Sequence, residues 1–167
     1  MINLVKMAVE GCTTDQEFLK RLAGEQFTAH WSPAVLAKNV NLRAGAWMRI
    51  AAGGGPAAHI AREVLIKAYA CDVTPGVVFE GAFHLPHPVG IVIGEGSVIK
   101  DGVTIYQNVT IGANRHGQYP VIGREVTIYP SSVVAGNLEI GDGSVIGAEV
   151  FVGRSVPPRT TVTESLR

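Results

Sequence analysis

An aliphatic residue recurs every six positions through the second half of the chain. Between Ile93 and Val156, ten segments of six residues each open on Ile or Val, with one break after the fourth. The openings are Ile93, Ile99, Ile105, Ile111, Ile122, Ile128, Val134, Ile140, Ile146 and Val152. Ten aliphatics in phase would arise by chance about once in a million, so the chain contains a true repeat.

A period of six fits neither the 3.6-residue period of a helix nor the two-residue period of a simple strand. It fits a solenoid of triangular cross-section in which each hexad forms one flat side. The opening aliphatic then points inward and stacks on its counterpart in the next coil, with parallel strands about 4.8 Å apart. Gly stands second in six of the ten hexads, where it permits a sharp corner.

Three segments make a resemblance specific. They are HPVGIVIGEGSVI (87–99), VTIYQNVTIG (103–112) and SVPPRTTV (155–162). The chain resembles the hexapeptide-repeat acyltransferases, and within them the serine acetyltransferase branch. The resemblance implies a mainly β fold, a left-handed parallel β-helix, with a short α-helical cap before it. The left hand comes from the resemblance, because spacing alone does not give it.

Two regions follow from the pattern. Residues 1–70 are expected to form an α-helical cap, with helices near 13–24, from 32 through 52, and from Pro56 to about Ala70 after the break at Gly53-Gly54-Gly55. Such a cap covers the apolar open end of a solenoid. Residues 71–167 are expected to form the β-helix, with a first irregular coil filled by Phe79, Phe83 and Leu85.

Two further features interrupt the ladder. The spacing between Ile111 and Ile122 is eleven, so residues 113–120 (ANRHGQYP) are predicted to protrude as a polar loop, a common place for function. After Val156, the pair Pro157-Pro158 is expected to end the ladder, because proline cannot donate to it. An extended C-terminal tail is then predicted.

Composition excludes several classes of protein. Lys+Arg and Asp+Glu are both 14, so the formal net charge of zero does not favour binding to nucleic acid or to an anionic membrane. No segment is long and apolar enough to span a membrane. Two cysteines are too few for a disulfide framework. We therefore expect a cytoplasmic protein with two free thiols.

His87 is the leading catalytic candidate. It lies six residues before Ile93, where the pattern favours an aliphatic, and an unexplained break in a local rule often marks function. A histidine with an ordinary pKa near 6.5 suits a general base at neutral pH. By the resemblance, the catalytic His stands directly before the segment that ends in Gly-Ile-Val, which here is Pro88 to Val92.

The chain departs from the family at two places that recognise the acceptor. The family usually has Asp before this His, where the chain has Pro86, so Glu80, Glu95 or a backbone carbonyl would have to orient His87. The family also places an Arg-His pair directly before Pro-x-Ile. Here Tyr119 holds that place and Arg115-His116 lies earlier in the loop. His116 is the second catalytic candidate, and the candidate substrate-binding residues are Arg115, Tyr119 and Glu80.

Acetyl-CoA is the co-substrate that the resemblance implies, and no metal is expected. Small residues in the later coils would let the pantetheine arm lie along the solenoid, and two arginines could pair with its phosphates. The candidate CoA-binding residues are Gly136, Gly147, Ala148, Arg154 and Arg159.

The predicted function is acetyl-CoA-dependent O-acetyl transfer to a small hydroxyl acceptor, L-serine, in a ternary complex. A sugar or surface-polysaccharide hydroxyl is the alternative acceptor. Less favoured hypotheses are a zinc protein of the γ-carbonic anhydrase type, with His84, His87 and His116 as ligands, and a non-catalytic scaffold. The resemblance also implies a homotrimer with active sites between subunits.

Overall fold

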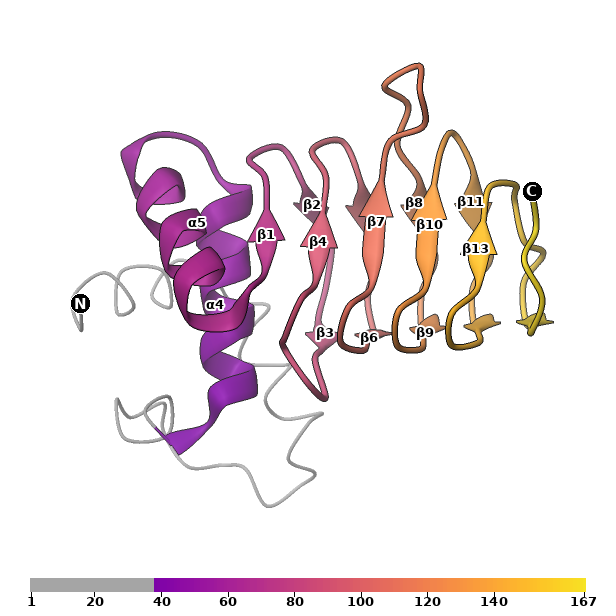
Figure 1. Ribbon diagram of the computed structural model, residues 1–167, viewed down its shortest axis with the longest axis horizontal. Coiled ribbons are helices and arrows are strands. Elements are labelled where there is room, and N and C mark those ends of the chain that lie inside the picture. Colours follow the sequence, from indigo (N-terminus) through magenta and orange to yellow (C-terminus); the bar gives the residue numbers. More distant parts are fainter. Residues whose placement is uncertain (1–37) are drawn as a thin grey trace.

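The computed structural model describes residues 38–167, and the helices predicted before residue 38 lie outside this range. Two helices stand at one end of a row of short strands, and the last residues of the chain lie at the other end (Figure 1). The helices are α4 (Val40–Ala52) and α5 (Pro56–Tyr69). Neither is long or apolar enough to cross a membrane. The break at Gly53-Gly54-Gly55 and the start at Pro56 agree with the prediction.

The strands form three parallel sheets, which are the three sides of a prism. Sheet 1 contains β1 (Asp72–Val73), β4 (Val92–Ile93), β7 (Thr110–Gly112), β10 (Val133–Ala135) and β13 (Phe151–Val152). Sheet 2 contains β2 (Val78–Phe79), β5 (Val98–Ile99), β8 (Val121–Ile122) and β11 (Glu139–Ile140). Sheet 3 contains β3 (Phe83–His84), β6 (Val103–Ile105), β9 (Thr127–Ile128), β12 (Val145–Ile146) and β14 (Thr161–Val162).

The predicted inward columns of aliphatic residues are confirmed. All ten hexad-opening residues have no exposed surface. Each pairs with its counterpart one coil away, as Ile93 does with Ile111 and Ile99 with Ile122. Full burial of an aliphatic side chain contributes about 1.5–3 kcal/mol, so these columns supply the main driving force for the fold.

The two helices cover the open end of the first coil. Met48 of α4 and Leu65 of α5 are fully buried in the same core as Val73 and Phe83. Arg62 of α5 forms a two-pronged ion pair with Asp72 of β1, at 2.6 and 2.9 Å. The cap is thus joined to the prism by apolar packing and by charge-assisted hydrogen bonds.

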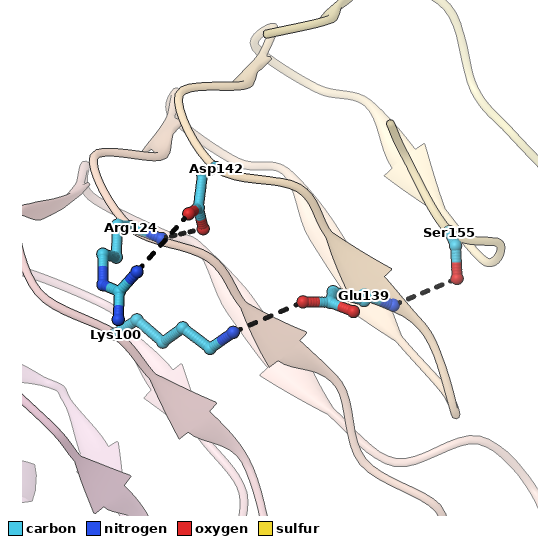
Figure 2. A network of polar contacts seen from close by, with 5 residues as sticks. All are labelled: Lys100, Arg124, Glu139, Asp142 and Ser155. Atoms are coloured by element: carbon cyan, nitrogen blue, oxygen red, sulfur yellow. Dashed lines mark hydrogen bonds and ion pairs between the residues drawn. The ribbon is translucent and has the colours of Figure 1, made fainter. Parts of the chain in front are cut away.

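A polar network ties the outer side of sheet 2 together across several coils (Figure 2). Lys100, which follows β5, reaches past β8 to Glu139 of β11, with 3.3 Å between its Nζ and Oε1 of Glu139. Asp142 accepts a hydrogen bond from the backbone N–H of Arg124 at 2.7 Å. The network links successive coils by side chains as well as by the strand ladder.

The prediction that the ladder ends at Pro157-Pro158 is wrong. Val156 still bridges to Ile140, β14 pairs with β12, and Leu166 bridges to Val152. The prolines are accommodated because they form a corner, where Ser144 donates to the carbonyl of Pro157 and accepts from the N–H of Thr160. The segment after them is therefore a further coil and not a free extended tail.

Candidate active site

Each edge of the prism carries a different set of candidate residues. We call the corners between sheets 3 and 1 the His87 edge (residues 86–91, 106–109, 129–132 and 147–150). The corners between sheets 1 and 2 are the loop edge (94–97, 112–120, 136–138 and 153–155). The corners between sheets 2 and 3 are the acidic edge (80–82, 100–102, 123–125, 141–143 and 157–160). These sets follow from the order of strands in the three sheets.

His87 lies on an exposed turn and not in the inward ladder. The pairing of β3 with β6 sets Phe83 opposite Val103. Two residues further on, Leu85 therefore falls opposite Ile105, and both are buried. The step from Leu85 to Ile93 is eight positions, whereas the other steps across the His87 edge are six, so the sequence-based placement of His87 at a hexad opening is wrong. The two added residues bring the imidazole to the surface.

An aromatic column supports His87 on its edge. Its ring centroid lies 6.3 Å from that of Tyr106, with the planes tilted by 56°. Tyr106 in turn stacks on Tyr129, with centroids 5.0 Å apart and planes within 15°. Tilted and offset ring pairs of this kind are attractive. Tyr106 is a further candidate site residue that the sequence analysis did not include, although a Tyr in the second hexad position of two successive coils was a usable signal.

The carboxylates considered as partners for His87 lie elsewhere. Glu80 is on the acidic edge and Glu95 on the loop edge, each one full side of the prism away from the His87 edge. Six residues at about 3.3 Å per residue span roughly 20 Å. Within one chain, therefore, neither carboxylate reaches the imidazole, and the ring of Tyr106 is the side-chain contact of His87 in residues 38–167 that the structure records.

The loop at 113–120 rises between β7 and β8, as predicted (Figure 1). Its tip is closed by Asn114, whose side-chain oxygen accepts from the N–H groups of His116 and Gln118 at 2.9 and 3.2 Å. Arg115 donates from Nε to Nε2 of His116 at 3.1 Å. Both side chains are exposed, which leaves them available to a ligand.

Tyr119 has a packing role at the base of this loop. Its ring lies over the turn from Gly94 to Gly96, so close that a Cβ on Gly94 would come within 2.7 Å of its Cε1. The next residue, Pro120, is buried. Tyr119 therefore fixes how the loop leaves the prism.

Within a single chain the loop and His87 do not meet. The loop leaves the carboxyl end of a sheet 1 strand, whereas the turn that carries His87 precedes the amino end of one. Figure 1 shows the loop and the β3–β4 connection on opposite sides of the row of strands.

The candidate CoA-binding residues are divided among the three edges. Gly147 and Ala148 share the His87 edge, Gly136 and Arg154 lie on the loop edge, and Arg159 lies on the acidic edge. Gly136 is covered by Asn114 of the loop, whose Cβ lies 3.6 Å from where a Cβ would stand. Arg154 and Arg159 are both exposed.

The three histidines of the zinc hypothesis are also apart. His84 is in β3 of sheet 3, while His87 and His116 occupy two different edges. Residues 38–167 contain no group of three or more His, Cys, Asp or Glu side chains that could hold a metal ion. Partial burial lowers the pKa of His84, because the charged imidazolium loses hydration.

Comparisons with known proteins first define the class. A family model described as "Bacterial transferase hexapeptide (six repeats)" matches residues 119–154. Soybean serine acetyltransferase complexed with serine superposes with a TM-score of 0.78 over 95% of this chain and 70% of its own, at 27% identity. An Entamoeba histolytica serine acetyltransferase (isoform 3) in complex with cysteine gives a TM-score of 0.71 at 27% identity, over 92% of this chain and 58% of its own. The fold is therefore a left-handed parallel β-helix with hexapeptide repeats, as predicted.

Curated relatives then identify the branch of the hexapeptide-repeat proteins to which the chain is similar. A plasmid-encoded serine acetyltransferase of Synechococcus elongatus is 36% identical over 120 residues, which are 65% of this chain and 38% of that protein. A serine acetyltransferase of Salmonella typhimurium is 34% identical over 122 residues, 71% of this chain and 44% of that protein. The resemblance to the serine acetyltransferase branch is confirmed, and the chain spans less than half the length of these curated relatives.

Proposed function

We propose that the protein is an acetyl-CoA-dependent O-acetyltransferase of the serine acetyltransferase type. The carrying observation is the match of 95% of the chain to a serine acetyltransferase complexed with serine. The His87 segment supports it, because the histidine stands exposed beside a column of rings and not inside the core. L-Serine is the first candidate acceptor.

The proposed reaction is direct transfer. An imidazole nitrogen of His87 accepts the proton of the acceptor hydroxyl as its oxygen attacks the thioester carbonyl. The tetrahedral intermediate then collapses, the C–S bond breaks, and the imidazolium returns the proton to the CoA thiolate. The products are an O-acetyl ester and free CoA. Holding both substrates side by side supplies much of the rate enhancement.

The proposed assembly is a homotrimer in which the His87 edge of one copy faces the loop edge of another. This arrangement would bring Arg115 and His116 to a neighbour's His87, which one chain alone does not do. Sheet 1, which lies between these two edges, presents the half-exposed apolar residues Val92 and Phe151, 39% and 38% exposed. Such residues favour burial against a second copy.

Acetyl-CoA would then bind between the same two edges. Gly147 and Ala148 come from one edge, and Gly136 and Arg154 from the other. The small residues leave room for a narrow arm, and the guanidinium of Arg154 suits a phosphate. Arg159 lies on the remaining edge, so it has the least geometric support among the candidate CoA-binding residues.

A sugar hydroxyl is the second candidate acceptor, and the tyrosine column favours it. Tyr129 is 39% exposed beside Tyr106 and offers a flat surface to a ring. The corner residues of the His87 edge include no Lys or Arg that could pair with the carboxylate of serine. A carboxylate would need a cation from the loop or from the cap.

Thiol release from acetyl-CoA tests the proposal, with L-serine in one series and a panel of sugars and glycans in the other. His87→Ala should lower kcat by about 10²–10⁴-fold, the usual contribution of a general base. His59→Ala is the matched control, because His59 is an exposed histidine of the cap whose ring nitrogen lies 3.1 Å from the backbone oxygen of Gly55, away from the His87 edge. Full activity of the His87 variant with every acceptor would refute the assignment of the base.

A further inference from the structure

The turn that carries His87 is anchored by the helical cap. This turn is two residues longer than the other corners of the His87 edge, so its backbone leaves the regular ladder of strand pairing with the adjacent coil. The carbonyl of Pro86, the residue directly before His87, accepts instead from the side chain of Asn41 in α4, at 3.3 Å. Carbonyl groups near a protein core need such a partner.

Further hydrogen bonds hold the other end of the same turn. Gly90 donates to the carbonyl of Tyr69, the last residue of α5, at 3.2 Å. Val89 accepts from the N–H of Asn108 in the next coil at 2.9 Å. Within the turn, Val89 donates to the carbonyl of His87 at 2.8 Å. From outside, the turn is fixed by both described helices and by the following coil, and among these external contacts that of Asn41 is the closest in sequence to His87.

Asn41 is itself placed accurately. Asn39 caps α4, and its side-chain oxygen accepts from the N–H groups of Asn41 and Leu42 at 3.1 and 3.2 Å. Asn41 is thus the second residue of a capped helix, and its side chain is half-buried against the turn. Leu42 and Ala44 are buried and hold the same turn of α4 in the core, so the donor of Asn41 does not depend on the cap alone.

We propose that Asn41 is a positioning residue that sets the orientation of His87 from the cap, an inference that rests on the proposed function of His87 as general base. The ring of His87 is exposed and contacts Tyr106 on one side. Proline fixes φ at Pro86 and Pro88, and Pro88 restricts the backbone of His87 before it, so the direction in which the Cα–Cβ bond of His87 leaves the turn depends on the Pro86 peptide group. The cap then has a catalytic task besides covering the core.

The substitution Asn41→Asp separates the positioning role of Asn41 from its effect on helix stability, because it is expected to lower kcat while leaving Tm nearly unchanged. A carboxylate in the first turn interacts favourably with the helix N-terminus, which offsets the stability lost with the hydrogen bond to Pro86, so Tm should change little. The ionised carboxylate cannot donate to the Pro86 carbonyl, so kcat should fall about fivefold, the usual loss for one hydrogen bond. KM for both substrates should change less than twofold, and Asn41→Ala should lower kcat similarly.

Asn39→Ala is the matched control, because it removes the helix cap but leaves the donor of Asn41. It should lower Tm with kcat within twofold of the original. Amide hydrogen exchange of a peptide covering residues 86–92 gives a readout independent of activity. Exchange should be faster in Asn41→Asp than in the original protein, and unchanged in Asn39→Ala.

The outcomes distinguish the two proposals. Unchanged kcat and exchange in Asn41→Asp would overturn the positioning role, and so would an equal loss of kcat in Asn39→Ala. An original protein without acetyl transfer, but with the expected exchange difference, would overturn the catalytic role of His87 while supporting the anchoring contact.

Discussion

Gly94→Ala should displace the protruding loop through a single contact. Gly94 lies under Tyr119, and a Cβ there would stand 2.7 Å from Cε1 and 3.4 Å from Cδ1 of the ring. Optimal carbon–carbon contacts are about 3.5–4.0 Å, so the ring must move by roughly 1 Å. Gly94 does not have a positive φ, so alanine adds no backbone strain and the effect isolates the side-chain clash.

The expected cost is that of overpacking, about 1–3 kcal/mol. For a chain of this size each kcal/mol lowers Tm by about 2–4 °C. Because Tyr119 holds the base of the loop with Arg115 and His116, KM for the acceptor should rise more than KM for acetyl-CoA. Thermal unfolding and thiol-release kinetics measure the two effects.

A double-mutant cycle provides the control. Tyr119→Ala removes the ring, so adding Gly94→Ala in that background should cost almost nothing, and the coupling should equal the cost of the single variant. If Gly94→Ala lowers Tm equally in both backgrounds, the clash with Tyr119 is not the cause and the reasoning fails.

Three further predictions concern stability. Gly141→Ala should destabilise the last coil by about 1–3 kcal/mol, because a Cβ would clash with the backbone N of Pro158. Urea unfolding measures this loss, and an unchanged midpoint would contradict the prediction. Asp72→Asn should make Tm less sensitive to acid. The hydrogen bond from Arg62 holds the pKa of Asp72 below its usual value. The ion pair therefore stabilises the fold above about pH 4, and this contribution is lost as pH falls through the lower folded pKa. His84→Gln should flatten the loss of Tm below about pH 6.5. Partial burial lowers the pKa of His84, so the stability contributed by its neutral imidazole is full above the unfolded pKa and declines as pH falls toward the lower folded pKa. Melting curves between pH 3 and pH 8 test both, and identical profiles for variant and original would contradict them.

The repeat was predictable because its physical cause is local. Each inward position needs an aliphatic residue and each corner permits a small one, so period and phase appear directly in the sequence. All ten predicted inward residues are buried. The loop at 113–120 was predictable for the same reason, since five residues too many cannot fit in one flat side.

The positions where the prediction was wrong depend on a break in phase. Counting back six from Ile93 reached His87, but the inward residue is Leu85, because two residues were added at that corner. The residue types at Pro157-Pro158 predict an end of the ladder, yet prolines at a corner need no ladder donor. A count of residues does not tell whether an irregularity lies within a side or at a corner.

The sequence by itself determined the triangular solenoid, the protruding loop and the candidate base, since these follow from periodicity and from a recognisable segment. Only the tertiary structure decided which residues share an edge. It places Tyr106 and Tyr129 beside His87, and it places Glu80 and Glu95 each one side of the prism away. It also brings Asn41 of the cap to the Pro86 carbonyl. The physical reason is that edges run across coils. Residues about 20 positions apart become neighbours there through strand pairing, which the spacing along the chain does not specify once the phase has shifted.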